Sequence, residues 1–520
     1  MVSESRELTS LARKVKLTRQ LNTFDTTNLV VGSTIGADIY VAAALCAKLL
    51  GSASLVIWFI GGVMATVIAL SFAYCAAILP RAGGPYAYAK EAAGPFSGFM
   101  VGWALLLAEW FSLAVFPVAF TQYFLAFVPG LDPLAQILLK AAFMLIIVVT
   151  NMFGVKAAGK FNDILTIAKV SPLLLLIGLG VIYVIAQPQM TLSHFQPFLG
   201  GDPHNIGQVL VIVFWAYAGF ELSTLPADEI QDPKKTIPRA IMVGMLIVAV
   251  FYIITNFVVI GVVDRASLAS SQAPLTVAAA NILSLSPVLA WIGSLVVGIG
   301  ALISIMGADE SGTIGTSRLA FAMSVDGLLP RAFSRLQKSY RTPYVALAVV
   351  CSTAFVASII GTLPALVNSS VFLLSFAYLA TGISTYLLER KHQRLTEKQA
   401  GRLLIPMLTI IFSLVLMTQV TEQQILVSLV LLAIGVPVYT FFSPKKELQE
   451  LKEAFLSREA ILERTYHQEE VFLAYVMRRI KLLIYRRKGI QRAWIVEEET
   501  PGVDGESPRR FTEEDRARGR

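Results

Sequence analysis

Apolar stretches of about 20 residues recur along the chain, separated by short polar segments. A stretch of that length crosses a hydrocarbon core about 30 Å thick when it forms an α-helix. We therefore predict an all-α membrane protein with twelve transmembrane helices. They are predicted at residues 24–48, 53–79, 97–128, 134–153, 162–186, 206–226, 239–263, 288–322, 343–361, 364–388, 403–420 and 424–442.

The polar segments are of two alternating kinds, and this alternation predicts an orientation. One set is rich in basic residues, whereas the other holds only Lys48 and Arg265. Basic loops lie on the cytoplasmic side of a membrane. We therefore expect a multi-pass protein of the cytoplasmic (cell) membrane with both termini cytoplasmic.

The chain divides into three regions: a cytosolic N-terminus at residues 1–23, a twelve-helix domain at 24–442 and a cytosolic C-terminal tail at 443–520. The tail is highly charged, and we expect it to be partly helical, with a disordered end. Its basic run at residues 478–488 suits contact with anionic lipid. A solvated helix, or one that packs in a homodimer, suits the same run equally well.

The composition supports a membrane protein and argues against other classes. The chain is 55% hydrophobic and 15% charged, with a mean hydropathy of +0.67, whereas soluble domains carry about 25% charged residues. The net charge of +8 belongs to the basic loops, so we expect no nucleic-acid partner. Cysteines and histidines are scattered, and catalytic and nucleotide-binding motifs are absent. We expect no metal, no cofactor and no enzyme activity.

The first predicted helix contains residues that disfavour both a helix and a membrane. Gly32, Ser33, Thr34 and Gly36 precede a carboxylate at Asp38. Each glycine costs about 1 kcal/mol relative to alanine in a helix, and an ionisable group at bilayer depth costs about 3 kcal/mol. Irregular backbone at this depth is tolerated only where it is buried in protein or lines a cavity. We therefore expect a broken helix whose amides are exposed to a ligand.

The sixth predicted helix carries an interruption of the same kind, with Gly219 and Glu221 near its end and Pro226 after them. If the first ten helices form two repeats of five, helix six corresponds to helix one. Paired interruptions at corresponding positions indicate a transporter binding site. Because helix N-termini suit an anion and unwound carbonyls suit a cation, the pair suits a zwitterion.

Four motifs resemble those of the amino acid-polyamine-organocation permeases. They lie at Gly32 to Tyr40, Leu79 to Tyr88, Phe214 to Ala240 and Ser317 to Pro330. The resemblance covers roughly residues 20–442 and excludes the tail. It implies a five-plus-five inverted repeat with helices 1 and 6 broken, the fold shared with the neurotransmitter:sodium symporters.

The resemblance also implies a set of binding residues. The substrate carboxylate would meet the amides of Ile35, Gly36, Ala37 and Asp38, with Ser33 and Thr34 beside them. The substrate amine and side chain would meet the broken sixth helix. The residues implied there are Phe214, Trp215, Ala216, Tyr217, Ala218 and Glu221. The aromatic rings among them are either lids over the substrate or ordinary packing residues.

Charged residues inside the predicted helices are candidates for coupling. By resemblance, Lys169 occupies the place that sodium holds in the symporters, as a proton-coupling site or as a fixed cation. We expect it to form an ion pair with Asp38 or Asp309. The intramembrane carboxylates are Asp38, Glu109, Glu221, Asp309 and Glu310. Their excess over lysine indicates that some are protonated, or that the substrate carries a second positive charge.

These features favour a secondary active transporter of amino acids that works by alternating access and is sodium-independent, through proton symport or exchange. The intramembrane carboxylates favour cationic amino acids or polyamines as substrates. The resemblance to the family by itself implies neutral amino acids. The alternative is a membrane amino acid sensor that binds without net transport.

Overall fold

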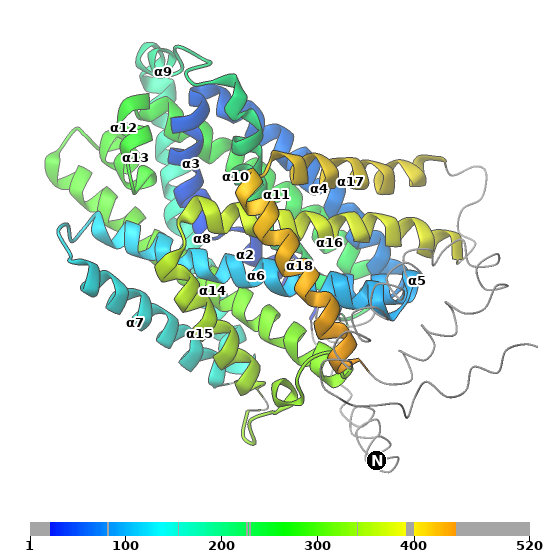
Figure 1. Ribbon diagram of the computed structural model, residues 1–520. Coiled ribbons are helices and arrows are strands. Elements are labelled where there is room, and N and C mark those ends of the chain that lie inside the picture. Colours follow the sequence, from blue (N-terminus) through cyan, green and yellow to red (C-terminus); the bar gives the residue numbers. More distant parts are fainter. Residues whose placement is uncertain are drawn as a thin grey trace, which may run out of the picture. The chain divides into compact units, whose positions relative to one another are not determined.

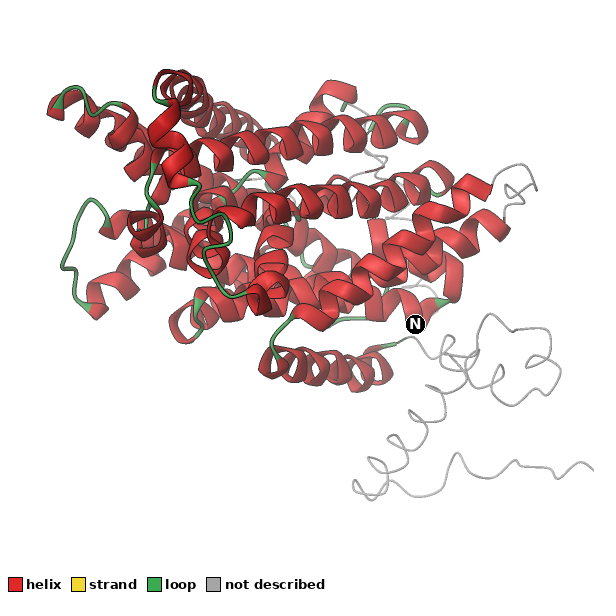
Figure 2. Cartoon of the chain, turned by 90° about the horizontal axis from the view of Figure 1, so that it is seen from above, coloured by secondary structure: helices red, strands yellow, loops and turns green. Residues whose placement is uncertain are grey.

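The computed structural model describes residues 21–80, 83–153, 155–224, 227, 230–340, 342–391 and 400–443. In this part of the chain all regular structure is helical, apart from an isolated bridge between Leu21 and Ile230 (Figure 2). Nearly all of the predicted N-terminal region and C-terminal tail lies outside the described residues.

Long helices follow the predicted apolar stretches. They are α4 (Ser54–Ile78), α6 (Pro95–Leu125), α7 (Pro133–Met152), α8 (Val155–Ala186), α11 (Pro233–Val262), α14 (Pro287–Val325), α15 (Tyr344–Ile360), α16 (Leu363–Lys391), α17 (Ala400–Gln419) and α18 (Glu422–Phe442).

The first and sixth predicted helices are each divided. The first consists of α2 (Thr23–Thr34) and α3 (Ala37–Leu50), and the sixth of α10 (Ile206–Tyr217) followed by the 3-10 helix η3 (Phe220–Thr224). Short helices complete the connections: η1 (Gly51–Ala53), α5 (Gly84–Ala93), α9 (Pro188–His194), η2 (Pro203–Asn205), α12 (Arg265–Ser270), α13 (Pro274–Ile282) and η5 (Arg331–Ser334).

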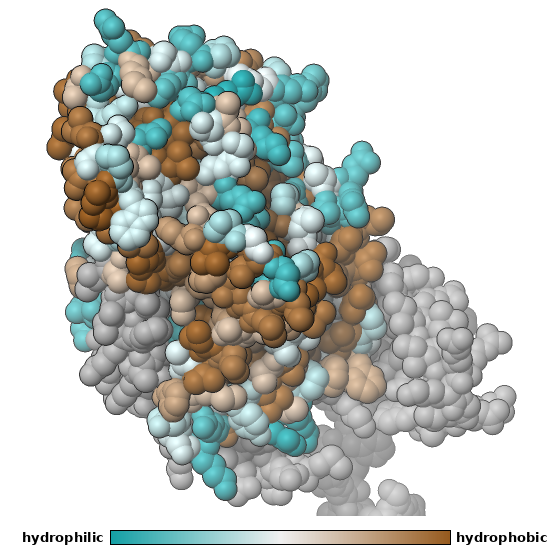
Figure 3. Space-filling model, turned by 90° about the vertical axis from the view of Figure 1, so that its left-hand side faces the viewer, coloured by the Kyte–Doolittle hydropathy of each residue, from teal (hydrophilic) through white to brown (hydrophobic). Residues whose placement is uncertain are grey.

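Among the described residues, nine helical runs are long and apolar enough to cross a membrane, with Ala37–Ile78 taken as one run, and two further apolar helices are shorter. The prediction of an all-helical membrane protein is therefore supported. The count of twelve crossings and the repeat symmetry stay predictions. On the face drawn in Figure 3, hydrophobic residues form a broad continuous patch, with hydrophilic residues gathered above and below it.

Helices distant in sequence surround the divided first helix. α11 and α14 pack against both α2 and α3, and α10 packs along α3. Around them, α11 packs along α4, and α14 packs along α8 and α6. α2 and α3 lie among these longer helices (Figure 1). Most of α3 is buried, including Asp38 and Tyr40.

Close approach between α14 and the first helix requires a glycine at the break. A Cβ on Gly36 would lie 2.7 Å from the Cβ of Ala308 and 2.8 Å from a carboxylate oxygen of Asp38. These separations are too short for a side chain, and glycine is the residue that lets a backbone come this close.

Candidate functional site

The chain leaves the helical conformation between α2 and α3. Ile35 is extended, with ψ of 102°, and Gly36 has φ of −135° and ψ of −142° before α3 begins at Ala37. The amide of Ile35 still donates to the carbonyl of Val31 at 2.9 Å. That amide is therefore already paired within α2, which argues against its predicted role in binding a substrate carboxylate.

Side chains from other helices satisfy the carbonyls at the C-terminus of α2. The ammonium of Lys169 on α8 donates to the carbonyl of Gly32, and the hydroxyl of Tyr252 on α11 donates to that of Thr34 at 2.8 Å. The last carbonyls of a helix lack partners within it, and the negative end of the helix dipole attracts a cation. The fully buried Lys169 therefore supports the break.

The break in the sixth helix meets the break in the first. After α10 ends at Tyr217, Ala218 is extended and Gly219 has φ of +116°. The hydroxyl of Ser33 donates to the carbonyl of Gly219 at 2.9 Å. A Cβ on Gly219 would come within 2.6 Å of the Ser33 carbonyl oxygen. Both the left-handed conformation and the close approach therefore call for glycine.

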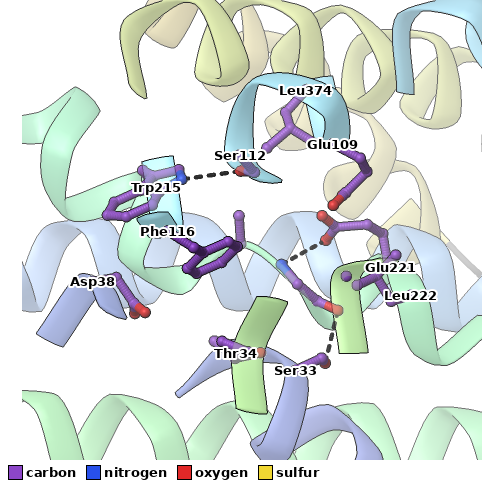
Figure 4. A pocket seen from close by; sticks show the side chains of 14 residues that line it. Ser33, Thr34, Asp38, Glu109, Ser112, Phe116, Trp215, Glu221, Leu222 and Leu374 are labelled. Carbon is purple, nitrogen blue, oxygen red and sulfur yellow. Dashed lines mark hydrogen bonds between the residues drawn. The ribbon is translucent and has the colours of Figure 1, made fainter. Parts of the chain in front are cut away.

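A pocket opens where the two breaks meet, with α6, α14 and α16 around it (Figure 4). Its cavity measures about 40 Å³, room for a few water molecules at most. The indole of Trp215 donates to the Ser112 hydroxyl at 3.1 Å and links α10 to α6. In this conformation the pocket is contracted, so a larger ligand requires the surrounding side chains to separate.

One end of the pocket carries a pair of carboxyl groups. Glu109 on α6 and Glu221 in η3 point toward each other (Figure 4). The Oε2 of Glu221 accepts from the amide of Gly219 at 3.1 Å. Its Oε1 is buried with no hydrogen-bond partner among the described residues. A buried polar atom without a partner is costly, so this end of the pocket favours a ligand that donates hydrogen bonds.

Residues 21–444 match the family model described as amino acid permease. The chain belongs to the amino acid permease family. This result agrees with the resemblance in the sequence motifs, and the permease family consists of transporters rather than enzymes.

Individual relatives are similar to the permease over most of their length. The branched-chain amino acid permease BcaP of Bacillus subtilis is 27% identical over 458 residues, covering 82% of this chain and 94% of that protein. The methylthioribose transporter of the same organism is 26% identical, covering 85% and 97%. The human cystine/glutamate transporter is 29% identical, covering 70% and 72%.

The pocket of the permease contains part of the predicted site. The predicted residues that line it are Ser33, Thr34, Asp38, Glu109, Trp215, Ala218 and Glu221. The carbonyl of Trp215, expected to meet the substrate amine, accepts from the amide of Ala218 at 3.1 Å. That carbonyl is therefore already paired within the break. The broken helices line the pocket with side chains as well as backbone.

Several lining residues are not among the predicted ones: Ser112, Phe116, Gly219, Leu222, Ala308, Gly312 and Leu374. The sequence contains a pattern that could have identified two of these residues. Ser112 and Phe116 follow Glu109 by three and seven positions, so all three share one face of α6. Nothing in the sequence around Leu374 distinguishes it from other apolar residues of α16.

Other predicted residues do not line the pocket. They are Ile35, Gly36, Ala37, Phe214, Ala216, Tyr217, Lys169, Asp309 and Glu310. The hydroxyl of Tyr217 donates to the Trp58 carbonyl at 3.1 Å, and its ring packs against Trp58 and Tyr252. The structure therefore places Tyr217 in an aromatic cluster. Of the two roles considered for this ring, this arrangement agrees with packing rather than with a lid over the substrate.

The ion pair expected between Lys169 and Asp38 or Asp309 is not formed among the described residues. Lys169 donates to the Gly32 carbonyl, and the Asp38 carboxylate is hydrogen-bonded to the Tyr252 hydroxyl. Both oxygens of Asp309 are buried without a partner in the described part of the chain. The ammonium bonds to the end of α2, which offers its own acceptor. Lys169 and Asp38 still interact electrostatically, and a proton-sharing pair between them stays a prediction.

The carboxylate of Glu310 faces a different helix from the pocket. It accepts from the hydroxyl of Thr150 on α7 at 2.7 Å. Successive residues of an α-helix point about 100° apart, so Ala308 and Gly312 reach the pocket while Glu310 does not. Within the described residues, no group of three or more histidine, cysteine or acidic residues is placed to hold a metal ion.

Ser33→Ala is expected to lower the initial rate of substrate uptake about fivefold, because it removes the bond to the Gly219 carbonyl, worth about 1 kcal/mol. Ser294→Ala is the matched control, since that hydroxyl donates to the Thr276 carbonyl at 3.0 Å outside the pocket. Uptake by reconstituted protein is the measurement. Equal rates for the two variants would contradict a role for the contact between the breaks.

Proposed function

We propose that this permease is a secondary active transporter that moves amino acids across the cytoplasmic membrane by alternating access. The observation that carries the proposal is the pocket at the junction of the two helix breaks, where Ser33 is hydrogen-bonded to Gly219. A transporter binds its substrate at such a junction. Relatives named as amino acid transporters support the same conclusion.

Transport is proposed to be independent of sodium and coupled to protons or to exchange. The support is the buried ammonium of Lys169, which donates to the Gly32 carbonyl of the broken helix. A lysine ammonium fixed at this position would make a bound sodium ion unnecessary. The candidate proton carriers are Lys169 itself and the intramembrane carboxyl groups Asp38, Glu109, Asp309 and Glu310.

A preference for cationic amino acids or polyamines is part of the proposal. Three carboxyl groups, Asp38, Glu109 and Glu221, line the pocket, and its lining contains no basic side chain. Opposite charges attract most strongly where water is excluded. We also propose that both termini are cytoplasmic and that the tail contacts lipid, as the distribution of basic residues in the sequence suggests. A homodimer that packs through the tail is the alternative for the same basic run.

Reconstitution into liposomes tests the proposal. Labelled amino acids and polyamines are presented with and without a sodium gradient, and with and without a pH gradient. We expect saturable uptake that is unchanged when sodium is replaced. Uptake that requires sodium would contradict the role proposed for Lys169. Saturable binding without uptake or exchange would favour the sensor instead.

A further inference from the structure

We propose that the ligand of this pocket is a linear diamine, because the protein's own Asp38 carboxylate occupies the place that an amino acid's carboxylate would need. The inference rests on the proposed transport function of the pocket and narrows its substrate class. One ammonium group would lie at Asp38 and the other at Glu109 and Glu221.

Asp38 supplies an anion to the N-terminus of α3. It is the second residue of that helix, directly after the break, and Gly36 at the N-cap has no side chain to cap it. One carboxylate oxygen of Asp38 lies beside the break, since it would be 2.8 Å from a Cβ added to Gly36, and the other is hydrogen-bonded to the Tyr252 hydroxyl. A helix N-terminus is an anion-binding site. In this permease a side chain already fills that site.

A substrate carboxylate at the same helix end would lie beside the Asp38 carboxylate. Like charges a few ångströms apart repel strongly in a water-poor site. An ammonium group at this position is attracted instead. Asp38 is only 5% exposed and lines the pocket, so a ligand in the pocket meets its charge without much intervening water.

The opposite end of the pocket has acceptors for a second ammonium. Figure 4 shows Glu109 and Glu221 on the far side of Phe116 from Asp38. The Oε1 of Glu221 is 
buried and has no hydrogen-bond partner among the described residues. An ammonium group carries three donors and no acceptor, which matches an end lined by carboxyl groups.

The middle of the pocket suits a methylene chain. Phe116 lies between the acidic ends, and Trp215 lines the pocket on the side of Asp38 (Figure 4). Aromatic rings bury apolar groups well. The cavity is narrow at about 40 Å³, so an unbranched ligand needs the smallest displacement of side chains. A diamine also brings two positive charges to three carboxyl groups, whereas a zwitterion brings no net charge.

Cadaverine and lysine provide the test, because they differ only by the α-carboxylate. Full-length protein is reconstituted into liposomes, and uptake of each labelled compound is measured. We expect kcat/KM for cadaverine to exceed that for lysine by at least about tenfold, since a site built for one charge pattern rejects the other. Putrescine and ornithine, which differ in the same way, should show the same order.

Variants of Asp38 show whether that carboxylate causes the preference. Asp38→Gly frees the end of α3, and we expect it to weaken cadaverine uptake at least about tenfold and to raise uptake of lysine. Asp38→Asn keeps the shape of the side chain and removes its charge, so it replaces the glycine variant if that protein does not fold. We expect the same loss of cadaverine uptake. Asp132→Asn is the matched control, because Asp132 caps α7 outside the pocket and asparagine caps equally well.

Each outcome bears on the inference. Uptake of lysine or leucine without cadaverine would overturn the diamine assignment and leave the proposed transport function standing. Cadaverine uptake that is unchanged in both Asp38 variants would overturn the role of Asp38. Folded, monodisperse protein that transports none of these compounds would overturn both the inference and the proposed function.

Discussion

Lys169→Met is expected to lower the initial rate of substrate uptake by at least tenfold. The substitution removes the ammonium that donates to the Gly32 carbonyl and leaves that carbonyl buried without its donor. An unsatisfied buried group costs about 1–3 kcal/mol, and the cost falls on the helix end that borders the pocket. Uptake into proteoliposomes, normalised to folded protein, is the measurement.

Lys140→Met is the matched control for this prediction. The ammonium of Lys140 on α7 donates to the Ser358 carbonyl at 2.7 Å, so it makes the same kind of bond away from the two breaks. We expect this variant to retain uptake within about twofold, since the bond that it removes lies away from the pocket and from both breaks. Equal losses in both variants would show that Lys169 acts only through general stability.

Gly219→Ala is expected to abolish uptake and to lower the Tm of the purified protein. Alanine is strained at φ of +116°, and its Cβ would meet the Ser33 carbonyl oxygen at 2.6 Å. Strain of this kind costs about 1–3 kcal/mol, and it acts where the two broken helices meet. Thermal unfolding in detergent and uptake after reconstitution are the measurements.

Gly178→Ala is the control for the glycine substitution. Gly178 lies within α8, and no atom outside the helix backbone lies within 4 Å of the position of an added Cβ. Alanine is favoured over glycine in a helix by about 1 kcal/mol, so we expect an unchanged or slightly higher Tm and normal uptake. A Gly219→Ala protein with normal uptake would contradict the proposed requirement for glycine at the second break.

Local sequence features predict the elements of this protein well. Apolar length places the helices, because a membrane requires about 20 residues per crossing. The breaks are visible for the same local reason: Gly32, Gly36 and Gly219 interrupt stretches that are otherwise apolar. The breaks can therefore be located before any contact between helices is known.

The directions of the charged side chains cannot be read in the same way. Lys169 could reach a carboxylate or a backbone carbonyl, and its actual partner depends on how α8 approaches the end of α2. Asp309 and Ala308 are adjacent in sequence, yet only Ala308 lines the pocket. The rotation of α14 about its axis determines which of them does so.

The sequence alone determined an all-helical membrane protein, two broken helices and an excess of intramembrane carboxylates, because hydrophobic length, glycine and charge act locally. The tertiary structure decided that the breaks meet at Ser33 and Gly219, that Asp38 is hydrogen-bonded to Tyr252 of α11, and that Glu109 faces Glu221. These relations depend on the rotation and approach of helices distant in the chain. No periodicity within a single helix specifies them.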